Sequence, residues 1–284
     1  MAVTTVTDLN SLYNTIYERA LFVAREANLM AQLVDNRSAT GWMSRVVPVR
    51  PQVSAISVGE TEDFNAPTTF GKSTLATLTP GEIMAQVVLT DRDVETDPDS
   101  AARDAELELG MAVATKIDVD LLGLFSSFTD KGNGANGTAT FTQFAGAVSI
   151  LRNSFAQQGG VINAVLHPYQ WHDLWLELGK PAATYTNLQG VTERALEDYY
   201  MTTLLGGIRI YTSSNISVDS SDDAIGGLFS RPAIMLDTRR PTRMEQERDA
   251  SARATELNIN AGYAYGIVKS TYGLGFKTDA SAPV

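Results

Sequence analysis

The sequence predicts an α+β fold in which a very long helix and a projecting hairpin accompany an inserted α/β unit. Apolar residues repeat at every fourth position from Ala105 to Phe125, which indicates a single helix. The range 41–90 instead holds β-branched residues, prolines and glycines without a helical period. Between residues 140 and 230, helical and extended patterns alternate. With 284 residues, the chain is long enough for roughly two domains.

The first segment, 1–40, is predicted to be an arm that contains an amphipathic helix. Apolar residues recur at helical spacing from Leu9 to Met30, and either Thr7 or Asp8 is suitable as the N-cap. Such a helix has one apolar face to bury.

The next segment, 41–90, is predicted to form two long extended arms joined at a tip. Pro48 and Pro51 lack the N–H group that a central strand donates, so the first arm is expected at a sheet edge or projecting from the body. The tip, with the sequence GETEDFNAP, carries three acids: Glu60, Glu62 and Asp63.

The range 91–137 contains the most clearly predicted element. Asp97 and Pro98 provide a cap and a first helical position, and acids follow in the first turn, where the helix dipole favours them. The helix is expected to run for about 30 residues, or about 45 Å. It ends at the glycine-rich loop 130–138, and the alternating acids before it are predicted to form a solvated acidic strand.

The range 138–230 is predicted to be a compact α/β subdomain. Its expected helices lie at 141–157, after Pro168 and near 191–204, and its expected strands have the sequences VINAVLH and GIRIYTSS. From Arg231 onwards the pattern turns to strands. Apolar residues alternate from Leu257 to Ile267, which is typical of a half-buried strand. The tail, DASAPV, is expected to be disordered.

Composition excludes several classes of function. The chain has 33 acids and 22 bases, a net charge of −11, which argues against a protein that reads nucleic-acid sequence. There is no cysteine and only two histidines, so we expect no disulfide, no metal centre and no cofactor. The sequence has no apolar leader and no apolar run of membrane-spanning length, so we expect the protein to stay in the cytoplasm in which it is made.

The charges are separated along the chain. Residues 91–130 hold eleven acids and three bases, whereas residues 231–253 hold six arginines and four acids. Arginine outnumbers lysine 16 to 6. Because arginine forms planar, bidentate pairs with carboxylates at interfaces, this composition favours protein partners.

Three motifs in the sequence suggest a binding or catalytic site, but the residues around each of them do not fit that site. GNGANG at 132–137 matches a dinucleotide-binding pattern, but a helix enters this loop where the motif needs a strand, so we interpret it as a flexible connector. His167 and His172 are five apart and do not share a face as metal ligands would. Asp118 and Asp120 are about 200° apart around a helix and cannot form a carboxylate pair. We therefore predict that the chain is not an enzyme.

The order of these parts resembles the major capsid proteins of tailed bacteriophages, which share the Johnson shell fold. LTDRDVETDPDSAARDAELELGMAVATKIDVDLLGLF is similar to that family's passage from acidic strand into spine helix, with Gly110, Ala114 and Asp118 at the expected places. VLHPYQWHDLW, LLGGIRIYTSSNI and RMEQERDASARATELNINAGYAYGIV are similar to its A-domain and P-domain segments. The resemblance implies five parts: an N-arm at 1–40, an extended E-loop hairpin at 41–90, a P-domain with the spine helix at 91–137, an inserted α/β A-domain at 138–230, and P-domain closing strands with a C-terminal tail at 231–284.

The resemblance implies a structural protein of the virion that self-assembles, as hexamers and pentamers, into an icosahedral shell around double-stranded DNA. Assembly is expected in the host cytoplasm, without a membrane and without sequence-specific DNA binding. A portal and a separate scaffolding protein are the expected partners, because the N-arm begins too close to Met1 to leave room for a scaffolding region. Two alternatives stay open: an encapsulin-type nanocompartment shell that holds a cargo protein, and a soluble α/β enzyme with an unrecognised site.

The candidate interaction site joins the acidic hairpin tip to an arginine cluster in the loop before the closing strands. We predict that the tip of one subunit reaches the cluster of a neighbour; the residues are Glu60, Glu62 and Asp63 on the tip and Arg239, Arg240 and Arg243 in the cluster. The alternative is that these arginines pair locally with Glu245 and Glu247, while the tip stays in water.

Overall fold

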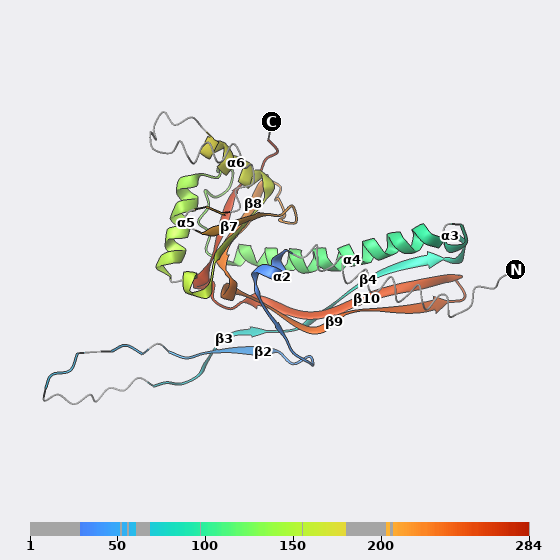
Figure 1. The fold of residues 1–284 in the computed structure, drawn as a ribbon, viewed down its shortest axis with the longest axis horizontal. Coiled ribbons are helices and arrows are strands. Elements are labelled where there is room, and N and C mark those ends of the chain that lie inside the picture. Colours follow the sequence, from blue (N-terminus) through green and yellow to red (C-terminus); the bar gives the residue numbers. More distant parts are fainter. Residues whose placement is uncertain are drawn as a thin grey trace.

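The computed structural model describes residues 29–179, 203–204 and 207–283, apart from 52, 56, 61–68, 97 and 155. The predicted N-terminal helix lies outside the described residues, as do Asp97 and most of the predicted helix near 191–204. The described residues form three parts: a long body, a projecting hairpin and a five-stranded unit (Figure 1).

The body is a four-stranded sheet with one long helix along its face (Figure 1). Its strands are β1 (Asp35–Ser38), β4 (Gly81–Thr90), β9 (Ile234–Asp249) and β10 (Ala254–Ile267). The strand order is β1-β9-β10-β4, with β1 parallel to β9 and the other pairs antiparallel. Leu109 and Val113 of the helix share a buried cluster with Leu257 and Ile259 of β10. The alternation predicted for β10 is thus explained by burial against this helix.

The long helix predicted from Pro98 is confirmed as α4, Pro98–Gly123, with 26 residues. A single 3-10 turn, η1 (Leu124–Ser127), continues it until Phe128 adopts an extended conformation and is buried. Buried side chains follow the predicted four-residue spacing: Ala105, Leu109, Val113, Leu121 and Phe125.

The acidic stretch before α4 is a short helix, α3 (Asp91–Thr96), so the predicted acidic strand is wrong. The neighbouring strand β10 begins at Ala254, opposite Thr90, and the pairing ends there. The Asp91 N–H donates to the carbonyl of Arg253, and the Asp91 carboxylate accepts two bonds from the Arg248 guanidinium, at 2.5 and 2.6 Å. These bonds turn the chain at the end of the sheet.

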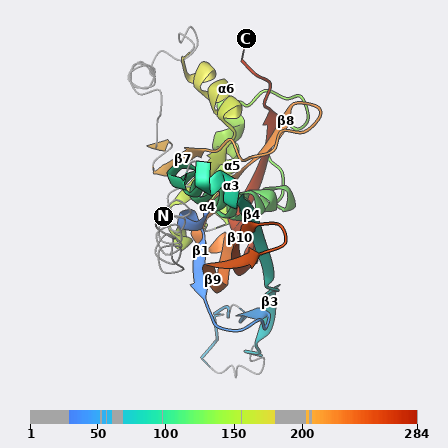
Figure 2. The ribbon, with the colours of Figure 1, turned by 90° about the vertical axis from the view of Figure 1, so that its right-hand side faces the viewer.

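The projecting hairpin consists of β2 (Arg45–Val49) and β3 (Ser73–Leu78), which pair antiparallel. The register shifts between Val47 and Pro48, where proline cannot donate to the ladder. The paired part of the hairpin is shorter than the range 41–90, because β4 leaves it at Gly81 and pairs with β10 along its whole length. Figure 2 shows the hairpin at the opposite end of the molecule from α6 (Pro168–Gly179).

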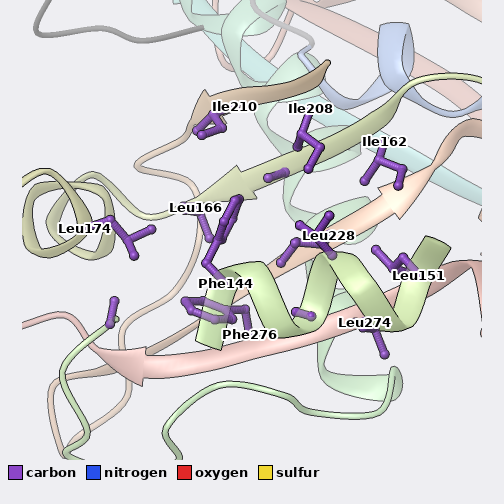
Figure 3. Close-up of a cluster of buried hydrophobic side chains, with 14 of the residues drawn as sticks. Phe144, Leu151, Ile162, Leu166, Leu174, Ile208, Ile210, Leu228, Leu274 and Phe276 are labelled. Carbon is purple, nitrogen blue, oxygen red and sulfur yellow. The ribbon is translucent and has the colours of Figure 1, made fainter. Parts of the chain in front are cut away.

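The five-stranded unit is a mixed sheet with the order β11-β8-β5-β7-β6. Its strands are β5 (Ile162–Leu166), β6 (Thr203–Leu204), β7 (Ile208–Thr212), β8 (Asp223–Ser230) and β11 (Gly273–Asp279); its helices are α5 (Phe141–Asn153) and α6. Phe144, Leu166, Leu228 and Phe276 meet in its core (Figure 3). The rings of Phe144 and Phe276 pack edge to face, with 6.1 Å between centroids. The α/β arrangement predicted here is confirmed in the described part of the range.

The last strand of this unit comes from the C-terminal end of the chain. β11 pairs with β8, so it belongs to the inserted unit rather than to the closing strands of the body. The tail expected to be disordered is ordered in part: Asp279 ends β11, and Ala280 is buried and donates its N–H to the Asp222 carbonyl at 2.6 Å. Burial of Phe276 in the unit's core holds this end of the chain in place.

The glycine-rich loop after α4 is a connector that packs beside β11. The N–H groups of Lys131 and Gly134 donate to the carbonyls of Gly275 and Lys277 at 2.8 and 3.2 Å. Gly132 lies so close to the Lys277 backbone that a side chain would collide with it. The loop is therefore held in place by β11, and the expectation of flexibility is wrong for it.

Candidate interaction surfaces

The three arginines of the predicted site lie within β9, not in a loop. This strand continues past Pro241 because β10 pairs with it on both sides of a bulge. Arg239 is the least accessible of the three, with a side chain 7% exposed, and its guanidinium binds the buried carboxylate of Asp237 at 2.7 Å. The Arg239 side chain is therefore buried in the body and is not accessible to a neighbouring subunit.

Arg240 and Arg243 stay partly open, with side chains 31% and 51% exposed. Arg240 binds Glu82 at 2.6 Å and lies over the ring of Trp42, 5.0 Å from its centroid. Arg243 binds Glu245 at 2.6 Å, which is the local pairing weighed in the sequence analysis. Because exposed pairs contribute only about 0–1 kcal/mol each, both guanidiniums remain available to a further carboxylate.

Of the three tip acids, the structure describes Glu60; Glu62 and Asp63 lie outside the described residues. Glu60 is exposed in a turn. The strands β2 and β3 extend away from β9 (Figure 1), and within the described residues no ion pair joins Glu60 to the three arginines. The predicted contact is therefore one between two copies of the chain.

The hairpin exposes apolar side chains along both arms: Val46, Val53, Val58 and Phe70. Arg50 of the first arm lies over the Phe70 ring of the second, 4.9 Å from its centroid. Apolar surface that projects from a body in this way is typical of an interaction site.

The body offers two exposed apolar surfaces of its own. One, the helix stripe, consists of Leu107, Met111 and Val119 on α4, which lie on one side of the helix because they are four and eight residues apart. The other is formed by Met84 and Val88 on β4. Neighbouring residues of β4, such as Ile83 and Val87, pack against the α4 core, so the pair lies on the opposite face of the sheet.

Asp118 and Asp120 have separate partners, as their spacing on the helix predicts. Asp118 is 1% exposed and accepts the Met30 N–H at 2.9 Å and the Asn215 side-chain amide at 3.4 Å. Burial raises the pKa of the Asp118 carboxyl, although these two bonds oppose the effect. Asp120 binds Lys116 and the Tyr263 hydroxyl, both at 2.6 Å. Asp118 therefore joins α4 to the chain at Met30 and to the loop after β7.

Asp219, Asp223 and His167 have partners within the chain. A cavity of about 230 Å³ between α4 and the β7–β8 loop is lined in part by Asp219 and Asp223, and Lys277 bridges these two carboxylates at 3.3 Å each. His167 accepts the Tyr169 N–H on its Nδ1, and burial lowers the pKa of its imidazole. Within the described ranges, no group of three or more His, Asp or Glu residues is arranged to hold a metal ion. Nor is any described helix long and apolar enough to cross a membrane.

Several solved structures with this architecture are phage capsids. The capsid of the cyanophage P-SCSP1u is similar with a TM-score of 0.63 and 13% identity, over 89% of each chain. The mature capsid of bacteriophage PhiM1 is similar with a TM-score of 0.65 and 12% identity, over 90% of this chain and 88% of that one. The chain has the phage capsid shell fold.

The same shell fold occurs in a virus-like particle from Pyrococcus furiosus, with a TM-score of 0.59 and 8% identity over 93% of this chain and 98% of that one. No protein-family model matches the sequence, and no curated protein is significantly similar to it. The likeness to phage shells is therefore one of fold.

The residues where the hairpin joins the body of this shell fold were not predicted from the sequence. Asp237 binds Arg45 of β2 in addition to Arg239, and its hydrogen bond to Arg45 raises the pKa of that guanidinium. The available signal was an acid directly after the apolar run AIML in a predicted strand. A carboxylate buried in that way needs a cation beside it.

Proposed function

We propose that this chain is a major capsid protein that self-assembles, as hexamers and pentamers, into an icosahedral shell enclosing double-stranded DNA. The observation that carries the proposal is the hairpin, which projects apolar residues such as Val53 and Phe70 beyond the body of a chain with the capsid shell fold. The hairpin and the helix stripe are different surfaces of the chain. A contact between the hairpin of one copy and the helix stripe of the next is therefore heterologous. Such contacts close into rings and, repeated, into shells.

The charge of the chain suits a container for DNA. A net charge of −11 disfavours tight binding to phosphates, which depends on basic side chains that displace counterions. The shell therefore encloses DNA without reading its sequence. A portal and a separate scaffolding protein complete the assembly in the host cytoplasm, and the product is the virion. The chain has no catalytic role in this process.

Contact between the acidic tip and the arginines of β9 forms part of the assembly interface. Glu60, Glu62 and Asp63 of one copy meet Arg240 and Arg243 of its neighbour, whose guanidiniums are partly open. Arg239, the third arginine of the predicted cluster, supports the contact from within through Asp237. A weak pair that is repeated around a shell contributes to closure through multivalency.

Negative-stain microscopy and size-exclusion chromatography test the proposal. The chain is expressed with and without a candidate scaffolding protein, and particles are treated with nuclease before their contents are extracted. Closed icosahedral particles, which protect DNA when they come from phage-producing cells, are the expected result. Small oligomers under all conditions would contradict self-assembly and favour a soluble enzyme.

A particle that contains a defined protein and no DNA would favour the nanocompartment alternative. That alternative stays open because the shell fold by itself does not determine what a particle encloses. Extraction of protein and nucleic acid from the same purified particles distinguishes the two shells.

A further inference from the structure

A buried carboxylate lies where the hairpin leaves the body. The side chain of Asp237, on β9, is 0% exposed. Arg45, the first residue of β2, donates to both of its oxygens: Nε to Oδ2 at 2.9 Å and Nη2 to Oδ1 at 2.8 Å. Arg239 binds Oδ2 from the other side at 2.7 Å. We call these three residues the hairpin clamp.

The fork of Arg45 fixes a direction as well as a distance. Two parallel N–H···O bonds between planar groups allow one relative orientation, which a single bond from a lysine does not impose. The same guanidinium also lies 3.5 Å from the carbonyl of Ser38, at the end of β1. Arg45 is thus tied to two strands of the body sheet.

The segment that enters the hairpin packs over the bulge in β10 at Gly262. Trp42 lies against Gly262, where a Cβ atom would be only 2.7 Å from the indole ring and where β10 has a bulge. The guanidinium of Arg240 also packs on Trp42, over the face of its ring. Arg239 reaches the carbonyl of Gly41 at 3.5 Å.

The strand that leaves the hairpin is anchored by apolar contacts. Leu78, the last residue of β3, is buried with Met235, Ala264 and Val268. A Cβ atom at Gly266 would lie 2.6 Å from Leu78, so glycine makes room for this side chain. Both arms are therefore fixed at their base, by an ion pair on one side and by a small core on the other.

We propose that the hairpin clamp sets the direction of the hairpin before subunits meet, so that Arg45 and Asp237 are positioning residues for assembly. This inference rests on the proposed function for its biological meaning, but the orientation itself is a property of one subunit. Beyond the base, the pairing of β2 with β3 shifts its register between Val47 and Pro48. The clamp therefore acts on the part of the arm that lies before this irregularity.

The experiment measures hairpin direction in unassembled subunits. Because the chain contains no cysteine, spin labels are placed at Leu75→Cys on β3 of the hairpin and Val161→Cys before β5, both exposed sites. Double electron–electron resonance gives the distribution of distances between them. Arg45→Met removes the fork but leaves Asp237 paired with Arg239. Arg50→Met is the matched control, because that arginine lies over Phe70 within the hairpin.

The unmodified clamp is expected to give one narrow distance peak, which Arg45→Met broadens and Arg50→Met leaves unchanged. Arg45→Lys, which keeps the charge without the fork, is expected to broaden the peak partly and provides a folded variant if Arg45→Met does not fold. An unchanged peak in the folded Arg45 variants would overturn the proposal.

If the parent chain forms no particles, the proposed capsid function is contradicted, but the distance comparison still tests whether the hairpin clamp sets the direction of the hairpin. If it does form them, Arg45→Met is expected to give fewer closed particles than Arg50→Met.

Discussion

Gly227 on β8 marks the place where the five-stranded unit meets the end of α4. A Cβ atom there would lie 2.5 Å from the ring of Phe125. Phe125 is completely buried and also packs against Phe229, with 5.6 Å between ring centroids. The packing of the Phe125 ring directly on the Gly227 backbone therefore joins the five-stranded unit to the body.

Gly227→Ala is therefore expected to destabilise the subunit by about 1–3 kcal/mol, the usual cost of overpacking a core. Gly146→Ala is the matched control: Gly146 is exposed on α5 and has nothing within 4 Å of its added methyl group. This control is expected to gain up to about 1 kcal/mol, because alanine is the better helix former. Urea denaturation measures both, and equal effects of the two variants would contradict this packing argument.

Asp118 gives the subunit a specific dependence on pH. Because burial raises the pKa of its carboxyl above the ordinary value of 3.8, the folded chain holds this proton more tightly than the unfolded chain. Its contribution to stability is therefore most favourable below the ordinary value and is lost as pH rises through the raised pKa. Asp118→Asn keeps an oxygen for the Met30 N–H and has no charge to bury.

The stability of Asp118→Asn relative to the parent chain is expected to increase between about pH 4 and pH 7. Unfolding free energies of both proteins across this range measure the difference. A difference that stays constant with pH would show that Asp118 does not titrate differently in the two states.

At the scale of elements, α4 combines a buried face with an exposed apolar stripe. Gly110 and Ala114 lie on the buried side. Gly110→Leu is expected to lower stability by about 1–3 kcal/mol through overpacking. Met111→Leu, at the adjacent exposed position, is the control and is expected to leave the melting temperature unchanged.

The hairpin is expected to have two levels of protection against hydrogen exchange. Its base, β2 and β3, is paired and anchored to the body, so it is protected both in isolated subunits and in shells. Residues 53–59 lie beyond these strands and are expected to exchange rapidly until a neighbour covers them. Equal protection of 53–59 in both states would contradict a role for this segment in assembly.

Periodic elements were predictable from the sequence, and long-range partners were not. The four-residue repeat from Ala105 to Phe125 predicted α4, because burial of one helix face leaves a local pattern. The acidic stretch at 91–96 was read as a strand, since its helix depends on Arg248 and on where β10 begins. Of the candidate site, Arg240 and Arg243 are partly exposed, and their contact with the hairpin tip of a neighbour stays a prediction. The inward role of Arg239 depends on Asp237, whose burial leaves no periodic signal.

At the scale of the whole molecule, charge reversal tests the contact between copies. Glu60→Arg with Glu62→Arg is expected to reduce particle yield while leaving the subunit folded, because the tip then repels Arg240 and Arg243 of a neighbour. Adding Arg240→Glu and Arg243→Glu to the same chain is expected to restore part of the yield. Arg239 is left unchanged in this design, because its loss would disturb Asp237.

Particle counts by microscopy measure the yield of assembly, and melting temperatures of the subunits show separately whether each variant is folded. Normal particles from the tip variant, with an unchanged dependence on salt, would rule out the tip contact.

The parallel pairing of β1 with β9 has a consequence for the order of events during synthesis. Asp35 pairs with Met235, and Arg45 binds Asp237, although β5 to β8 of the five-stranded unit are encoded between them. In a nascent chain, β2 is therefore synthesised well before Asp237, the residue that orients it. Only when the last fifth of the polypeptide has been translated do β9 and β10 close the sheet and orient the arm. A chain that ends before β9 lacks Asp237 and is therefore expected to lack an oriented hairpin.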